Sequence, residues 1–105
     1  MTLALISSDT RITELGDGRT TVTTAGTAVQ ISSTDTPCGG ITITAETDNT
    51  NIVTVGASTV VAALSTRRGH PLSPGGSITI PNTNLNQVWI DAITATEGVT
   101  YVYYK

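Results

Sequence analysis

The fold is decided by the stretch Ile41-Thr42-Ile43-Thr44-Ala45-Glu46, in which apolar and polar residues alternate without interruption. Successive side chains of a β-strand point to opposite faces, so one face of this segment carries Ile and Ala while the other carries Thr and Glu. We expect the first face to lie on a core and the second to point outward. The stretch therefore predicts a half-buried strand of a sheet protein.

Further runs with strand character lie on either side, separated by turns rich in Gly, Pro, Asn and Ser. They span residues 19–24, 27–32, 52–55, 59–64, 77–80, 87–93 and 99–104. Run 59–64 is apolar throughout, which predicts burial on both faces, although its alanines also allow a helical turn; run 77–80 is expected to stop at Pro81. About eight strands at a spacing of about 8–12 residues favour a β-sandwich or barrel over alternating βαβ units.

Composition agrees with an all-β fold of one domain. The 105 residues suffice for one domain with a thin core. About one residue in five is Thr, Phe is absent, and the charged residues that favour helices are scarce. We therefore expect about eight short antiparallel strands in a single β-sandwich.

Charged residues make up only 12% of the chain, against about a quarter in a typical soluble domain. A surface of Thr, Ser and Asn is less costly to bury against neighbours than one of Lys and Glu, so the low charge favours a protein packed in an assembly. The net charge of −3 argues against nucleic-acid binding. The apolar run Leu3-Ala4-Leu5-Ile6 is too short for a membrane span and lacks the basic start of a signal peptide.

Residues 1–18 differ from the rest of the chain and are predicted to form an N-terminal arm or edge segment, with the β domain at 19–105. The segment Gly16-Asp17-Gly18 is typical of a turn and marks its end. Fully extended, the arm would reach on the order of 60 Å, far enough to touch a neighbouring subunit. Its apolar residues Leu3, Leu5 and Ile6 are therefore candidates for an assembly interface.

A longer pattern in the middle of the chain resembles small virion proteins of tailed phages. The pattern runs Ile52-x-x-Val55-Gly56-x-Ser58-x-Val60, then Gly69-x-Pro71-Leu72-x-Pro74-Gly75-x-Ser77-Ile78-x-Ile80-Pro81, with flanks at residues 26–31 and 85–90. The resemblance covers about residues 26–104. Its Gly and Pro residues specify turns and strand ends and carry no chemistry.

The resemblance implies a capsid decoration (cement) protein, or a module of a head or tail fibre, with a β-sandwich or jelly-roll fold. It further implies a homotrimer that is made in the host cytoplasm and binds the major capsid protein on the outer surface of the head. The alternative is a carbohydrate- or receptor-binding module of a fibre. No family signature of functional residues transfers to this sequence.

We expect no catalytic site, cofactor or metal. His70 is the single histidine, has no partner at a recognisable spacing, and is interpreted as a solvated loop residue. Cys38 is the single cysteine and is interpreted as a thiol beside a turn, with an intermolecular disulfide as the alternative. The segment Asp48-Asn49-Thr50-Asn51 offers oxygen ligands but lacks the order of a calcium loop, so a plain Asx-rich turn is the favoured interpretation.

The remaining candidates are interface residues. Arg67 and Arg68 form the only pair of adjacent cations, either a solvated loop tip or an ion-pair anchor to an acidic neighbour. Trp89 shares a strand face with Gln87 and Asp91, opposite the expected core side, so an interface, a second packed face and a sugar platform all stay open. Tyr101 and Tyr103 lie in a final strand with aromatic residues on both faces, and are assigned to the interface with Trp89.

Overall fold

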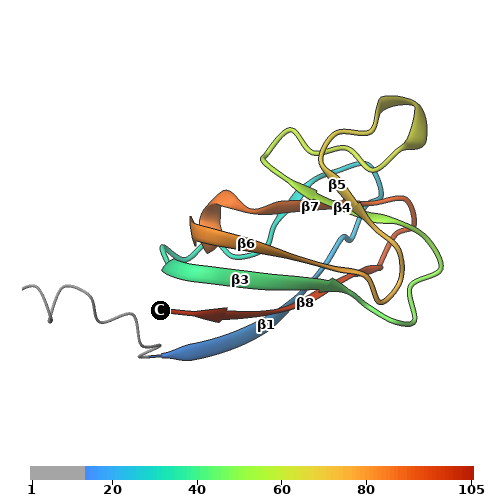
Figure 1. Ribbon diagram of the computed structural model, residues 1–105. Helices are drawn as coiled ribbons and strands as arrows, with labels where there is room; N and C mark the ends of the chain where they lie inside the picture. The colour runs from blue at the N-terminus through green and yellow to red at the C-terminus, as the bar shows by residue number, and fades with distance from the viewer. Residues whose placement is uncertain (1–13) are drawn as a thin grey trace, which may run out of the picture.

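The computed structural model describes residues 14–105, which form an all-β domain (Figure 1). Residues 1–13, including the interface candidates Leu3, Leu5 and Ile6, lie outside the described residues. The strands are β1 (Leu15–Thr21), β2 (Val29–Gln30), β3 (Pro37–Ala45), β4 (Val53–Gly56), β5 (His70–Leu72), β6 (Ser77–Asn84), β7 (Trp89–Ala92) and β8 (Gly98–Tyr104). Two short 3-10 helices, η1 (Leu64–Thr66) and η2 (Leu85–Gln87), join them, and no helix of the described part has the length and apolarity to cross a membrane.

The strands form two antiparallel sheets that lie one above the other (Figure 1). Sheet A has the order β1-β8-β3-β6, and sheet B has the order β2-β7-β4-β5. The first strand pairs with the last, the second with the seventh, the third with the sixth and the fourth with the fifth. A chain paired in this way is a long hairpin rolled into two sheets, which is the jelly roll. The predicted all-β sandwich is confirmed.

The core lies between the two sheets. Ile41, Ile43 and Ala45 of β3 are buried and face sheet B, as their alternation predicts. Sheet B contributes apolar side chains from β4 and β7, including Ile90. Most of these side chains are Val, Ile and Ala, so the core between the two sheets is thin.

The prediction of a strand at residues 59–64 is wrong. Val60 and Ala62 are buried, but the segment joins no sheet ladder, and its one β-bridge is between Val61 and Arg68. The strand in its place is β5, which the sequence assigned to a loop. β4 already has β5 and β7 as its two neighbours, so the apolar run lies over the sheet and not in it.

The expected stop at Pro81 is also wrong, because β6 continues through Pro81 to Asn84. β6 is the last strand of sheet A, and a proline is tolerated on an edge strand, where its missing N–H faces away from the sheet.

The turn expected at Gly16-Asp17-Gly18 is replaced by strand, since β1 runs through all three residues and across the predicted boundary after residue 18. The two glycines lie opposite tyrosines of β8, Gly16 opposite Tyr103 and Gly18 opposite Tyr101. A Cβ atom added to either glycine would overlap the facing tyrosine ring. The glycines therefore make room for aromatic rings that lie across the neighbouring strand, a known way to pair glycine within a sheet.

Candidate functional site

The two sheets differ on their outer sides, and the difference defines the candidate site. The outer side of sheet B is covered by residues 57–69, here called the cover loop, which lies on the side away from sheet A (Figure 1). Val60 of this loop lies close to Gly56 and Gly69, where a Cβ atom would approach within 3.3 Å and 2.8 Å of Val60 side-chain atoms. Glycine at these two positions lets the loop pack directly on the sheet.

Asp91 of β7 holds the cover loop on sheet B through a hydrogen bond. Its side chain is 1% exposed and points away from the core, in the phase opposite to Ile90 and Ala92. One carboxylate oxygen accepts the N–H of Gly26 at 3.0 Å, and the other accepts the N–H of Ala62 at 2.9 Å. The carboxylate therefore ties two loops to sheet B, and its buried charge is compensated by hydrogen bonds.

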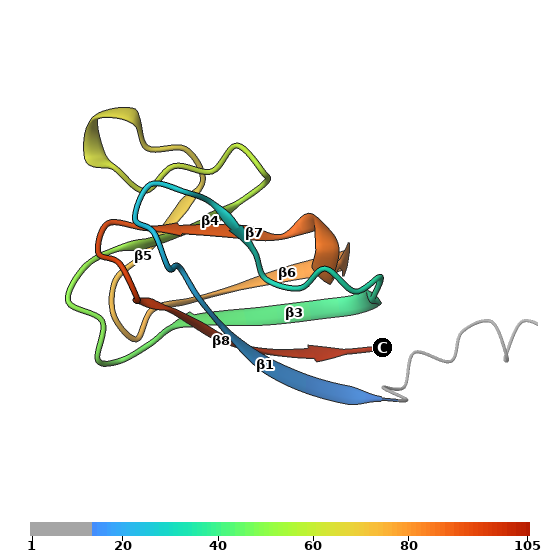
Figure 2. The ribbon, with the colours of Figure 1, turned by 180° about the vertical axis from the view of Figure 1, so that it is seen from behind.

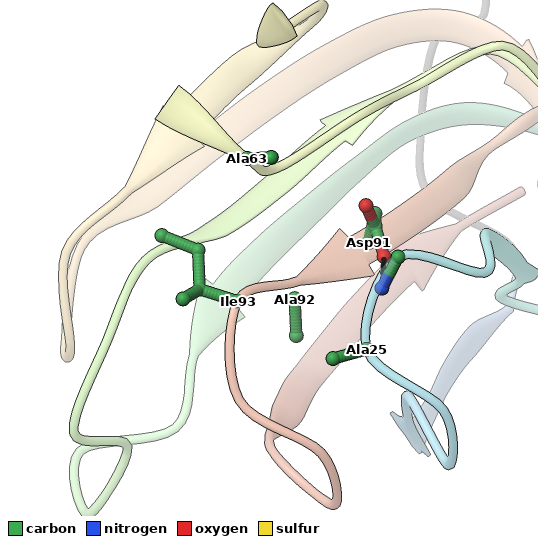
Figure 3. A pocket seen from close by; sticks show the side chains of 6 residues that line it. Ala25, Ala63, Asp91, Ala92 and Ile93 are labelled. Carbon is green, nitrogen blue, oxygen red and sulfur yellow. Dashed lines mark hydrogen bonds between the residues drawn. The ribbon is translucent and has the colours of Figure 1, made fainter. Parts of the chain in front are cut away.

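A hollow of about 230 Å³ lies beside Asp91. Figure 3 shows its walls, formed by Ala25, Ala63, Ala92 and Ile93 together with the Asp91 side chain, from three separate parts of the chain. The hollow is smaller than a typical ligand pocket. Both oxygens of its one carboxylate already accept backbone N–H groups, so the arrangement holds loops together and offers no free acid or base.

The outer side of sheet A has no such cover among residues 14–105, and we call it the open face. Three large apolar side chains are exposed on it: Leu15 is 69% exposed, Val102 49% and Tyr104 37%. Leu15 lies opposite Tyr104, and Val102 lies opposite Thr42 of β3. Val102 also lies opposite Asp17 of β1, and threonines of β3, β6 and β8 make up much of the remaining surface.

Two pairs of polar side chains contact one another on the open face. The hydroxyl groups of Thr42 and Thr79 are 2.9 Å apart and share a hydrogen bond. Arg19 forms an ion pair with Glu46 across the sheet. The face therefore carries one ion pair and the carboxylate of Asp17 beside its exposed apolar residues.

A second hollow, of about 380 Å³, lies at one end of the open face and is lined by Thr44, Ala45, Glu46, Thr47, Asp48 and Thr100. Asp48 in this lining is the first residue of the segment 48–51, which was interpreted from the sequence as an Asx-rich turn. Asn49 there is buried and donates its side-chain N–H to the carbonyl of Gly98 at 2.9 Å. Among the described residues, no three His, Cys, Asp or Glu side chains gather in a way that could hold a metal ion.

Glu97 anchors the same turn. It accepts the N–H of Thr50 at 2.5 Å, the hydroxyl of Thr50 at 2.8 Å and the N–H of Asn51 at 3.1 Å. Burial acts to raise the pKa of Glu97, but these hydrogen bonds outweigh it and hold the pKa below the ordinary glutamate value. The charged carboxylate is thus part of the folded structure.

The predicted interface residues that the structure describes do not form one surface. Arg67 donates its Nε–H to the carbonyl of Ala62 at 3.0 Å within the cover loop, whereas Arg68 is exposed. Trp89 is half-buried on the outer side of sheet B, opposite Gly56, and is not part of the core. Its predicted face, opposite the core, is thereby confirmed.

Tyr101 and Tyr103 lie elsewhere, on the inner side of sheet A. Their rings are 6.3 Å apart and pack against the core, and the hydroxyl of Tyr101 donates to the carbonyl of Ile31 at 3.5 Å. The assembly role of both tyrosines stays a prediction.

The sequence did not single out Leu15, Val102 and Tyr104. The phase of β8 would have placed Val102 and Tyr104 on one face, but Leu15 joins them only through the pairing of the first strand with the last.

The two residues interpreted as chemically inert are placed as follows. His70 is exposed at the start of β5. Cys38 lies within β3, opposite Thr83, and not beside a turn as expected. Burial raises the pKa of its thiol, which lowers the fraction of reactive thiolate.

Comparisons with models of known protein families, with curated proteins and with solved structures gave no match for this chain.

Proposed function

We propose that this protein is a structural protein of a tailed-phage virion, a decoration protein that oligomerises and binds the outside of the head shell through the open face. The observation that carries the proposal is the contrast between a sheet covered by its own loop and a sheet that leaves Leu15, Val102 and Tyr104 exposed. Exposed apolar residues gathered on one flat face are typical of a protein contact.

Two further features support this function. The chain has few charges for its size, so its surface can be buried in an assembly without a large cost of charge desolvation. The jelly roll is used by viral capsid domains and also by lectins. Because a fold alone does not determine function, the proposal rests on the open face and on the sequence resemblance to phage virion proteins.

The mechanism would be association without chemistry. The open face would bury its apolar residues against the major capsid protein and bridge neighbouring capsid subunits, so that more contacts must break before the shell opens. Contacts between copies, in trimers as the resemblance implies, would add avidity. The proposal assigns no catalytic residue, cofactor or metal.

The test is co-sedimentation of the protein with heads that are assembled from the major capsid protein of the same genome. Val102→Lys places a charge at the centre of the open face and should weaken binding by about tenfold or more, because the charge must be desolvated on contact. The matched control is Leu64→Lys, since Leu64 is 79% exposed on the cover loop at the other side of the domain. Equal binding of the two variants would remove the open face from the proposal.

The predicted arm needs a separate variant. Deleting residues 1–18 would also remove four residues of β1, from Leu15 to Gly18. Deleting residues 2–13 leaves the described domain whole and tests the arm alone. We expect weaker attachment to the heads and an unchanged melting temperature, and unchanged attachment would show that the arm has no part in binding.

A second candidate function is glycan binding by a fibre module. The observation in its favour is Trp89, which lies outside the core on the outer side of sheet B. Tryptophan in such a position can stack on a sugar ring. This function predicts a signal on a glycan array that Trp89→Ala abolishes, together with no binding to heads.

A further inference from the structure

The two sheets have four edge strands, and three of them are poorly suited to pair with another chain. β2 is two residues long, and β5 is three residues long with Pro71 in its middle. β6 contains Pro81, followed by Asn82 in the left-handed region at φ 47°. Short edges, prolines and local distortion are the means by which proteins prevent edge-to-edge pairing.

β1 is different. It is a regular strand of seven residues without proline, and within residues 14–105 only β8 pairs with it. In this described part of the chain, its other side is a free edge. Hydrogen bonds show which residues face that edge, because Lys105 donates to the carbonyl of Glu14 and Val22 donates to the carbonyl of Glu97. Facing alternates along a strand, so even-numbered residues face β8, and Leu15, Asp17, Arg19 and Thr21 turn their backbone groups to the free edge.

We propose that the free edge of β1 binds the same edge of a second copy, in an antiparallel pair around a two-fold axis at Gly18. Gly18 is the central residue of the strand, so this register pairs all of β1 with all of β1 in the second copy. It also brings together residues whose backbone groups face the edge. Leu15 lies opposite Thr21 of the second copy, and Asp17 lies opposite Arg19 of the second copy.

Charge selects the same register. Asp17 and Arg19 both project to the open face, and cross-strand pairs of opposite charge stabilise a sheet, whereas like charges directly opposite destabilise it. A shift by two residues in either direction would place Asp17 opposite Asp17 or Arg19 opposite Arg19. The full-length register is therefore also the register that forms two ion pairs.

The local structure leaves room for this contact. Arg19 is 63% exposed at its side chain, and its pair with Glu46 uses only two of the five guanidinium N–H donors. On the inner side, Gly16 and Gly18 have no side chains of their own, and the rings of Tyr103 and Tyr101 cover them. The result is one continuous sheet of two copies, with both open faces on the same side and the contact closed by symmetry.

This contact is independent of binding to a head shell. It is a two-fold contact, and it can join monomers into dimers or join trimers in pairs. In both cases, its loss halves the mass of the assembly. Failure of head binding would leave that result unchanged, so the two proposals fail separately.

The experiment is sedimentation velocity at low ionic strength and up to millimolar protein, where exposed charge pairs are least screened. Asp17→Arg should halve the mass and weaken self-association by about tenfold or more, because two attractive pairs become repulsive. Arg19→Asp should do the same. A mixture of the two variants restores both ion pairs in a mixed assembly and should restore the mass.

Asp35→Arg is the matched control, since Asp35 is exposed, lies outside β1, and the substitution changes the net charge equally. This variant should keep the mass of the wild type, and in a mixture with Arg19→Asp it should associate with itself and leave the Arg19→Asp copies at half the mass. A monomeric wild type, a mass that Asp17→Arg leaves unchanged, or rescue by the control would each overturn the proposal. Loss of self-association only on deleting residues 2–13 would assign the edge to the N-terminal segment and overturn it as well.

Discussion

The outer side of sheet B is closed by the chain itself, whereas the outer side of sheet A is open. Sheet B has strands of two to four residues, and the cover loop buries Val60 and Ala62 against it. Sheet A has strands of seven to nine residues and exposes Leu15, Val102 and Tyr104. Figure 2 shows the contrast from behind, with loops gathered beyond sheet B and bare strands in sheet A.

This difference indicates that the stability of sheet B depends on its loops more than that of sheet A does. Two-to-four-residue strands form few ladder hydrogen bonds, so sheet B needs packing on both sides to be stable. Longer strands form more hydrogen bonds, and one packed side is then sufficient. The outer side of sheet A is therefore available for a partner. Substitutions on the outer side of sheet B should lower the stability of the domain much more than substitutions on the outer side of sheet A.

The largest effect is expected at the closed side, for Asp91→Ala. The substitution leaves the N–H groups of Gly26 and Ala62 without their acceptor, the latter in a buried position. Leaving such groups unpaired costs about 1–3 kcal/mol each, so the free energy of unfolding should fall by about 3 kcal/mol. Urea unfolding measures it, and hydrogen exchange at the Ala62 amide should accelerate.

The control for that variant is Asp48→Ala, which removes an exposed carboxylate and should change stability by less than about 0.5 kcal/mol. Similar losses for both variants would mean that Asp91 does not fasten the cover loop.

A smaller effect is expected in sheet A from Gly18→Ala. The new methyl group would overlap the ring of Tyr101, which must then leave its place across β1. Overpacking of this kind costs about 1–3 kcal/mol. The measurement is a double-mutant cycle with Tyr101→Leu. The cost of Gly18→Ala should shrink when the ring is absent, and an unchanged cost would argue that the glycine serves another purpose.

Acid should weaken the hydrogen bonds between Glu97 and the segment 48–51. Its folded-state pKa lies below its unfolded-state value, so the carboxylate contributes stability above the unfolded pKa. That contribution is lost as the pH falls through the folded pKa. Thermal melts from neutral to acidic pH should show this decline for the wild type. Glu97→Gln should be less stable at neutral pH and should lose less on acidification; parallel curves would exclude Glu97 as a cause.

The sequence predicted what depends on local alternation and missed what depends on pairing. The phases of Ile41, Ile43 and Ile90 were readable because one side of each strand meets the core. The alternation also placed Trp89 and Asp91 on the outer side. It did not reveal that Asp91 is buried, because the loops that cover it come from residues near 26 and 62, which are distant in sequence.

Distance along the sequence also explains why the strand at Gly16-Asp17-Gly18 and the packing of run 59–64 were not predicted. Gly16-Asp17-Gly18 reads as a turn because its tyrosine neighbours lie about 85 residues away along the chain. Run 59–64 is apolar throughout, as in a buried strand, but it packs on a sheet without joining it. The open face was likewise invisible, since Leu15 meets Tyr104 only in the folded chain.

The smallest effect is expected on the open face, from Val102→Thr. Val102 is 49% exposed between Asp17 and Thr42, and threonine is equally suited to a strand, so the free energy of unfolding should change by less than about 0.5 kcal/mol. The same change at Val53, which is fully buried in sheet B, puts a hydroxyl into the core and should cost about 1–3 kcal/mol. Urea unfolding of the two variants compares the sheets directly with one chemical change. A cost at Val102 as large as at Val53 would mean that the open face is already covered in the free protein, and the partner would then have to bind elsewhere.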